Sequence, residues 1–305
     1  MTLVVGIVAF SAGLWLLVES VEGLVKSLHA WALAAGLSGV TIGALVLGFD
    51  IESTAAGVAA TLDDLPGTAL GASVGSAIFL MTVGLGVAAL VAPFAVRPPS
   101  ALLGAGAAAT VLSIVLSADG RLTRLDGALL LASFFPLVAA VVLGQPRSDT
   151  AAERERPARP KLLVLRVLGG LAGLVIGAEA LVFGTERVVS ELGLSETVFG
   201  LLVVAAAVSF EEVVLEALPA FRGFPELSVG NALGTLVFLL TGSLGVIVLA
   251  RPLEVPASVT GYHLPALGAS VTLAGAMLVR GRLGRTEGAL LLGTYAAYVT
   301  GALLW

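Results

Sequence analysis

Ten long apolar runs dominate this 305-residue sequence and determine the class of fold that it can form. Each run is about 20 residues long or longer, which is the length that an α-helix needs to cross the hydrocarbon core of a bilayer. Only 12% of the residues are charged, whereas soluble domains contain about 25%. The sequence therefore predicts an all-α integral membrane protein with ten transmembrane helices, at 2–25, 37–61, 67–93, 101–118, 126–144, 161–185, 194–219, 226–250, 262–280 and 286–304.

The residue inventory argues against an enzyme. The chain has no cysteine, which excludes disulfides, thiol catalysis and cysteine-based metal sites. The run G71-A-S-V-G75 satisfies the nucleophile pattern G-x-S-x-G, but an apolar helix follows it and no strand-to-helix elbow is predicted. No H-E-x-x-H occurs either. We therefore expect no catalytic residue, no cofactor and no nucleic-acid partner.

One polar segment divides the chain nearly in half. Residues 145–160 hold several prolines and arginines, and we interpret them as a linker between residues 1–144 and residues 161–305. With ten spans, placing this linker in the cytoplasm puts 12 of the 16 Lys and Arg residues on the cytoplasmic side. Basic residues favour that side, so the sequence predicts a multi-pass protein of the cell membrane with both termini extracellular.

The two halves resemble each other at an offset of 159 or 160 residues. The run G13-L-W-L-L-V-E19 matches G173-L-V-I-G-A-E179, and G71-A-S-V-G-S-A-I-F79 matches G230-N-A-L-G-T-L-V-F238. Five spans per half is an odd number, so the second half enters the membrane from the opposite side. This pattern predicts two inverted five-helix repeats, an arrangement in which the binding site lies near the membrane midplane.

Carboxylates lie inside the second and the seventh span, which correspond between the halves. Asp50 and Glu52 are near the middle of one, and Glu211 and Glu212 occupy the other. A carboxylate at the bilayer centre costs at least ~2.5 kcal/mol, and no Lys or Arg lies within these two spans. Bound cations or protons are the remaining means of neutralising these groups. For Glu216, near the cytoplasmic end of its span, snorkelling to the surface and lining an access path are equally expected.

Neutral oxygen donors accompany these acids at helical spacing. Carboxylate, hydroxyl and amide oxygens without His or Cys suit a hard cation such as Ca²⁺, Mg²⁺ or Na⁺. The pairs Gly71/Gly75 and Gly230/Gly234 are expected to let neighbouring helices approach closely. The candidate cation ligands are Asp50, Glu52, Ser53, Ser76, Ser209, Glu211, Glu212, Asn231 and Thr235.

The same segments resemble the α-repeats of the cation/Ca²⁺ exchanger superfamily, which includes the Na⁺/Ca²⁺ exchangers. The run G230-N-A-L-G-T-L-V-F238 is similar to the family's G-N-x-x-G-S-N, and A207-V-S-F-E-E212 occupies the place of its G-T-S-L-P-E. The resemblance covers both halves, with α-repeats at about 36–93 and 193–250. It implies the exchanger fold of ten helices, with Glu212 at the metal-binding glutamate and Ser209, Asn231 and Thr235 at neighbouring polar positions.

The sequence also departs from the family's motifs. Ser53 takes the first-repeat glutamate position, Asp50 takes a serine position, and Leu80 and Leu239 replace later polar residues. Glu52 and its counterpart in the second repeat stand where the family has a helix-breaking proline, so a weaker break is expected. A two-residue gap leaves a second alignment open, with Glu52 at the serine position and Ala55 at the glutamate position.

The resemblance implies secondary active antiport of a divalent cation, first of all Ca²⁺, against Na⁺ or H⁺ by alternating access. It further implies that the first and sixth spans slide over the other helices. Two alternatives remain on the same scaffold: exchange of Mg²⁺, Mn²⁺ or Na⁺/H⁺, and a passive channel or non-transporting cation-binding protein. The expected partners are inorganic cations and the lipid bilayer, and the chain offers no signal for an oligomer.

Overall fold

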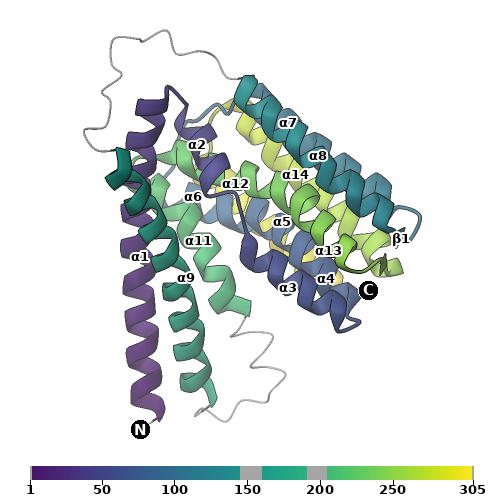
Figure 1. The fold of residues 1–305 in the computed structure, drawn as a ribbon, viewed down its shortest axis with the longest axis horizontal. Helices are drawn as coiled ribbons and strands as arrows, with labels where there is room; N and C mark the ends of the chain where they lie inside the picture. Colours follow the sequence, from purple (N-terminus) through teal and green to yellow (C-terminus); the bar gives the residue numbers. More distant parts are fainter. Residues whose placement is uncertain (1, 145–159, 191–204, 304–305) are drawn as a thin grey trace.

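The computed structural model describes residues 2–144, 160–190 and 205–303 (Figure 1). Within these ranges the chain is almost entirely helical, and eight segments are long and apolar enough to cross a membrane. Large apolar side chains such as Trp15, Val115 and Phe135 are more than half exposed on the outer faces of these helices, as expected where lipid is the solvent. The predicted all-α membrane architecture is therefore confirmed, and the predicted linker at 145–160 lies almost wholly outside the described residues.

The first half runs from α1 to α8. Its third span combines α-helical and π-helical pieces in one continuous rod. The elements are α1 (Thr2–Ala35), α2 (Gly39–Val46), α3 (Ile51–Leu62), α4 (Pro66–Leu70), η1 (Gly71–Gly75), α5 (Ser76–Phe79), η2 (Leu80–Gly84), α6 (Leu85–Val91), α7 (Ser100–Ser117), β1 (Arg121–Leu122) and α8 (Arg124–Leu143).

The second half runs from α9 to α15, and its eighth and ninth spans also contain π-helical turns. The elements are α9 (Pro160–Ser190), α11 (Ala205–Phe221), α12 (Pro225–Val237), η5 (Phe238–Ser243), α13 (Leu244–Ala250), β2 (Leu253–Glu254), η6 (Val259–His263), α14 (Leu264–Arg280) and α15 (Arg285–Ala302). π-Helical turns are rare and are often found at functional sites.

Helices α1 and α9 stand side by side along one flank of the molecule (Figure 1). Glycines permit this contact: a β-carbon at Gly13 would lie 2.5 Å from the backbone nitrogen of Leu181, and one at Gly177 would lie 2.8 Å from that of Leu17. Close packing through small residues is the usual way in which membrane helices associate. The two helices therefore form one tightly packed unit beside the remaining bundle.

The second predicted span is broken. Helix α2 ends at Val46, helix α3 begins at Ile51, and the intervening residues are not helical. Asp50 caps α3, because its side chain accepts a hydrogen bond from the backbone N–H of Ser53. The expectation of a weakened break is thus wrong for this span: a non-helical segment separates α2 from α3, and Asp50 caps the start of α3 although Glu52 replaces the proline. The corresponding helix α11 runs without interruption through Glu211.

Corresponding features recur in the two halves at an offset of 159. Pro66 and Pro225 each occupy the first turn of a helix. Thr82 lies in η2 and donates its hydroxyl to the carbonyl of Ile78, and Thr241 lies in η5 and donates to that of Val237. The equivalent π-helical turns therefore carry equivalent hydrogen bonds.

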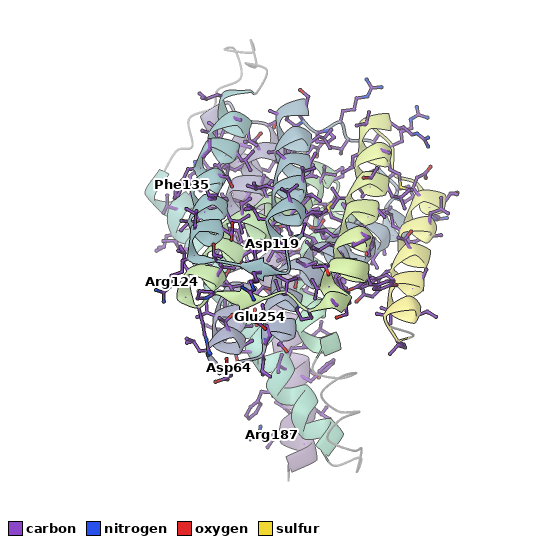
Figure 2. All side chains as sticks on the ribbon, turned by 90° about the vertical axis from the view of Figure 1, so that its right-hand side faces the viewer. Asp64, Asp119, Arg124, Phe135, Arg187 and Glu254 are labelled. Carbon is purple, nitrogen blue, oxygen red and sulfur yellow. The ribbon has the colours of Figure 1, made fainter. Side chains whose placement is uncertain are left out.

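The last helix described in each half packs against the other half. Helix α15 packs on α6 where Gly288 meets Gly86, and α8 packs on α13 where Gly127 meets Gly245. Two short β pairings accompany these contacts: Leu122 in β1 pairs with Leu253 in β2, and Phe94 forms a bridge with Leu283. Charged residues Asp64, Asp119, Arg124 and Glu254 lie toward the end of the bundle that carries β1 and β2 (Figure 2).

The predicted close approach is confirmed at one glycine pair. A β-carbon at Gly230 would lie 2.1 Å from the carbonyl oxygen of Val40, and one at Gly234 would lie 2.5 Å from the Cα of Ala44. Helix α12 therefore packs backbone to backbone against α2. At Gly71 and Gly75, in contrast, no described atom comes within 4 Å of such a β-carbon, so the expectation is wrong there for the described part of the chain.

Candidate functional site

The break in the second span brings Asp50 to the start of a helix. Its Oδ1 accepts a hydrogen bond of 2.8 Å from the backbone N–H of Ser53. Its Oδ2 is buried and has no hydrogen-bond partner within the described structure. The N-terminal end of a helix carries positive partial charge, which favours an anion at this position. Asp50 thus offers one unused carboxylate oxygen beside the break.

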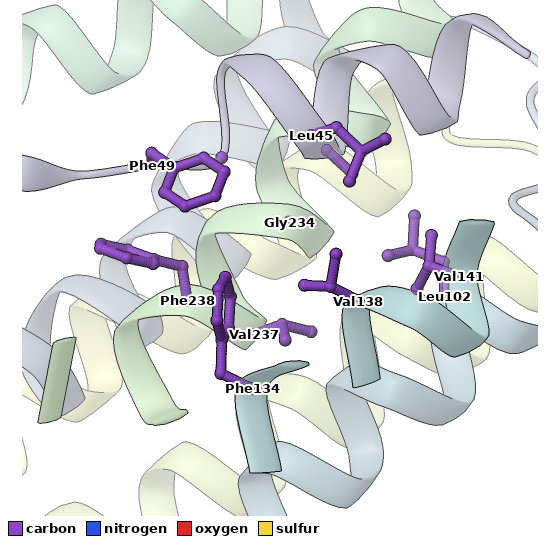
Figure 3. A pocket seen from close by; sticks show the side chains of 11 residues that line it. Leu45, Phe49, Leu102, Phe134, Val138, Val141, Gly234, Val237 and Phe238 are labelled. Atoms are coloured by element: carbon purple, nitrogen blue, oxygen red, sulfur yellow. The ribbon is translucent and has the colours of Figure 1, made fainter. Parts of the chain in front are cut away.

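Aromatic packing holds the non-helical segment in place (Figure 3). The ring of Phe49 lies 5.1 Å from that of Phe238 in η5 and 5.8 Å from that of Phe134 in α8. Gly48, one residue earlier, is packed against the backbone of Gly234. The segment that presents Asp50 is therefore fixed by contacts to both halves of the chain.

The acids of α3 and α11 meet across the two halves. The side chains of Glu52 and Glu211 lie close enough to interact electrostatically. Glu212, the next residue, interacts electrostatically with Asp50, Glu52 and Glu211. The structure therefore groups all four acids that the sequence singles out in these two spans.

Glu216 lies one helical turn beyond Glu212 and is completely buried, with 0% of its surface exposed. Its Oε1 accepts a hydrogen bond of 2.8 Å from Asn231 Nδ2, and Thr235 donates to Asn231 Oδ1 over 3.3 Å. The possibility that Glu216 snorkels to the surface is wrong, because its side chain turns inward toward α12. The inventory of candidate ligands omitted this residue, although its helical spacing from Glu212 was a usable signal.

The remaining candidates differ in their placement. Ser53 joins the group through Asp50, whereas no described contact links Ser76, at the start of α5, to the acids. Ser209 belongs to α11, but its side chain lies outside the described residues. Among the described side chains, no three Asp, Glu or His residues stand close enough together to hold one metal ion. The acids form an electrostatic cluster rather than a closed coordination shell.

Two further residues, absent from the candidate ligands, face this cluster. Tyr295 of α15 interacts electrostatically with Glu212, and its ring packs edge-on against Phe79 at 5.5 Å. Glu179 of α9 interacts electrostatically with Glu52. Helix α9 therefore contributes another negative charge, and α15 a phenol, to the surroundings of the cluster.

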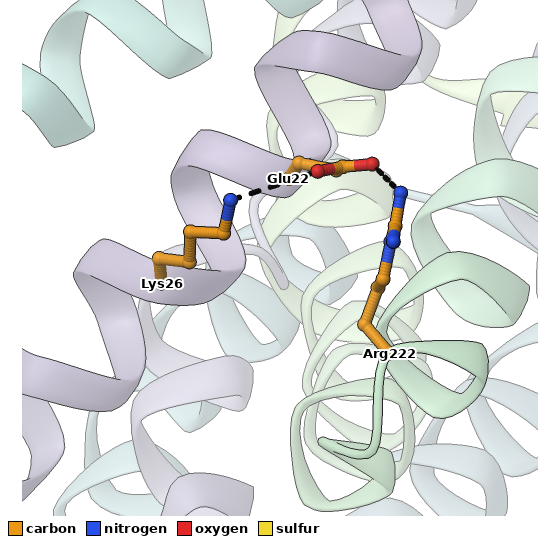
Figure 4. A network of polar contacts seen from close by, with 3 residues as sticks. All are labelled: Glu22, Lys26 and Arg222. Atoms are coloured by element: carbon orange, nitrogen blue, oxygen red, sulfur yellow. Dashed lines mark hydrogen bonds and ion pairs between the residues drawn. The ribbon is translucent and has the colours of Figure 1, made fainter.

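Basic side chains do not neutralise this cluster within the described structure. The ion pairs found there lie elsewhere: Arg251 pairs with Asp64, and Glu22 pairs with both Lys26 and Arg222 (Figure 4). Glu22 and Lys26 belong to α1, whereas Arg222 follows α11, so this network joins the α1–α9 unit to the bundle. The charge of the acidic cluster must therefore be balanced by protons or by ions from solution.

A multi-pass helical membrane protein with an uncompensated acidic cluster at a broken helix is the class of protein that this fold and site define. The chain belongs to the sodium/calcium exchanger protein family, whose model matches residues 5–143 and 162–304. The resemblance inferred from the α-repeat motifs is thereby confirmed.

Similar proteins and structures agree with this assignment. The chain is 28% identical to the proposed antiporter CaxA of Alkalimonas amylolytica, over 94% of this chain and 95% of CaxA. It is 26% identical to the uncharacterized membrane protein MJ0091 of Methanocaldococcus jannaschii, over 80% and 82%. A structure of the sodium-calcium exchanger NCX_Mj superposes with a TM-score of 0.85 at 23% identity, covering 98% of this chain and 99% of the other. At this level of identity, the structural match establishes the fold.

Proposed function

We propose that this protein is a secondary active antiporter that exchanges a divalent cation, first of all Ca²⁺, for Na⁺ or H⁺. The observation that supports this proposal most directly is a cluster of four acids without a basic partner among the described residues. These acids are Asp50, Glu52, Glu211 and Glu212. Such a cluster demands positive charge in both access states, so the cation and its counter-ion exclude one another. Mutual exclusion of two ions at one set of ligands is what couples their fluxes.

We assign the candidate ligands around this cluster as follows. The acids provide charge, and Ser53, Ser76, Ser209, Asn231 and Thr235 add neutral oxygens, a donor set suited to hard cations. The similar protein CaxA is named as an antiporter and NCX_Mj as a sodium-calcium exchanger, and both names favour this assignment. The close approach of Glu52 and Glu211 favours H⁺ as a counter-ion, because a proton on one of the two acids relieves their repulsion.

The proposed architecture is ten helices in two inverted five-helix repeats, residues 1–144 and 161–305, joined by a cytoplasmic linker at 145–160. Support comes from the equivalent proline, threonine and glycine features at offsets of 159 to 161. The ion pair between Arg251 and Asp64 and both β pairings join loops that this topology places on the same side. We further propose extracellular termini and a monomeric transporter.

The test is transport by the purified protein in lipid vesicles. An outward Na⁺ gradient and a pH gradient are imposed separately, and uptake of Ca²⁺, Mg²⁺ and Mn²⁺ is followed. We expect Ca²⁺ uptake driven by at least one gradient and abolished when the gradient is collapsed. Uptake that ignores both gradients would indicate a passive channel, and no uptake of any cation would refute the proposal.

A further inference from the structure

Glu216 and Asn231 form a buried pair that occurs in only one half of the protein. Glu216 is 0% exposed and Asn231 is 2% exposed, and their side chains are joined by a hydrogen bond of 2.8 Å. At the offset of 159, the corresponding residues in the first half are Gly57 and Ala72, which also lie in contact: a β-carbon at Gly57 would be 3.4 Å from Cβ of Ala72. Both members of the pair are therefore polar in one half and small in the other.

The neighbours of Glu216 also differ from those of Gly57, its counterpart in the first half. A β-carbon at Gly84 would lie 3.0 Å from Cγ of Glu216, so glycine at this position makes room for the glutamate. At the corresponding Gly57, Ile247 of α13 fills the space, since a β-carbon there would come within 2.3 Å of Cδ1 of Ile247. In both places a large side chain faces a glycine, which indicates that the fold provides the space for Glu216.

The hydrogen bond determines which way the amide of Asn231 points. Because Glu216 Oε1 accepts from Nδ2, Oδ1 faces the other way, toward Thr235. Helices α11 and α12 are antiparallel neighbours joined by a short connection. Glu212, one turn before Glu216, therefore stands level with Thr235, one turn after Asn231. The amide oxygen is directed along α12 toward the level of Glu212.

We propose that Glu216 is a positioning residue: it holds the Asn231 amide so that its oxygen is available to the transported cation beside Glu212. This inference rests on the proposed function and adds to it a determinant of cation affinity outside the acidic cluster. Without Glu216, the amide can turn its nitrogen toward the site, and an N–H donor repels a cation. The site then loses one oxygen ligand while its acids remain.

The experiment is a double-mutant cycle in the vesicle assay, with the half-saturating Ca²⁺ concentration as its readout. Glu216→Met keeps the chain length but removes the acceptor, and we expect this concentration to rise about tenfold with the maximal rate within about twofold. In an Asn231→Ala background the same change should shift it by less than about twofold, because no amide remains to be oriented. Equal shifts in both backgrounds would overturn the inference.

Three further variants keep the test decisive if Glu216→Met does not fold. Glu216→Gln retains a carbonyl acceptor of the same size and should restore the half-saturating concentration to within about twofold of wild type. If it weakens binding about tenfold, charge rather than orientation is the cause, and the inference fails. Gly84→Ala should displace Glu216 and raise the concentration, whereas Gly104→Ala, with no described atom within 4 Å of the new β-carbon, should not.

The wild-type protein separates the two proposals. If it shows no gradient-driven uptake, the proposed function fails before any variant is compared. If it exchanges cations and Glu216→Met leaves the half-saturating concentration unchanged, only the role of Glu216 is refuted.

Discussion

Glu52 of α3 and Glu211 of α11 stand 159 positions apart in the chain, and their side chains meet and interact electrostatically. A proton on one of the two carboxyl groups relieves their repulsion, and we expect a cation bound by both groups to displace it. Each residue also stands at the place where the exchanger motif has a proline. The two substitutions thus stand at corresponding positions of the two halves, and we expect them to link cation binding to proton release.

We predict that acidification weakens Ca²⁺ binding and that Glu52→Gln makes this dependence shallower. Protons and cations compete for the same carboxyl groups, so the half-saturating concentration should fall as pH rises. An amide at position 52 can donate to Glu211 without an added proton. The logarithm of the half-saturating concentration, plotted against pH, should then lose about one unit of slope. Glu254→Gln, in β2 away from the cluster, is the control, and an equal slope in Glu52→Gln would contradict the prediction.

We predict that Glu212→Gln abolishes exchange and leaves the protein folded. Glu212 interacts electrostatically with three other acids, and the motif resemblance aligns it with the metal-binding glutamate of the family. Removing its charge takes one negative ligand from the cluster and relieves repulsion, so thermal stability should be unchanged or higher. Uptake in vesicles and thermal unfolding in detergent are the measurements. Normal transport by this variant would show that the ion binds elsewhere.

The glycine contact between α2 and α12 should be intolerant of enlargement. A β-carbon at Gly230 would meet the carbonyl oxygen of Val40 at 2.1 Å, and both groups belong to the backbone. We expect Gly230→Ala to destabilise the protein by about 3 kcal/mol, since neither helix can yield locally. Gly275→Ala is the matched control, because its new β-carbon meets no described atom within 4 Å. Equal thermal unfolding temperatures for the two variants would contradict the packing described here.

The ion pair between Glu22 and Arg222 joins the α1–α9 unit to the bundle. Breaking this pair should alter the position of the α1–α9 unit relative to the bundle. The pair is partly exposed, so its contribution is about 1 kcal/mol or less. The chain has no cysteine, which allows spin labels at Ala30→Cys and Glu226→Cys without other changes. We expect Arg222→Gln to broaden or shift the distance between these labels. Arg251→Gln, which breaks the pair with Asp64, should leave it unchanged.

Sequence reasoning recovered what depends on long apolar runs and on internal repetition. Both signals are present along the chain, so the helical membrane fold and the correspondence of Glu52 with Glu211 between the halves could be predicted. It failed where a contact depends on which way a helix is turned. Glu216 was left between surface and interior, because only the position of α12 shows that it meets Asn231.

The sharp break before α3 could not be predicted for a different reason. The three-residue spacing of Asp50 and Ser53 is typical of a continuous helix. The same spacing also occurs between an N-cap residue and the amide that it caps, which is what the structure contains. Without a proline or a run of turn residues, the preceding Gly48 was the remaining local signal of a break.

The exchange of helices between the two halves has a consequence for how such a chain can be made and divided. Helix α15 completes the surface of α6, and α8 completes that of α13, so each half exposes glycine-lined backbone until the other arrives. We therefore expect neither half to complete its packing alone during synthesis. The contact surface of α6 stays uncovered in the membrane until α15 has been inserted.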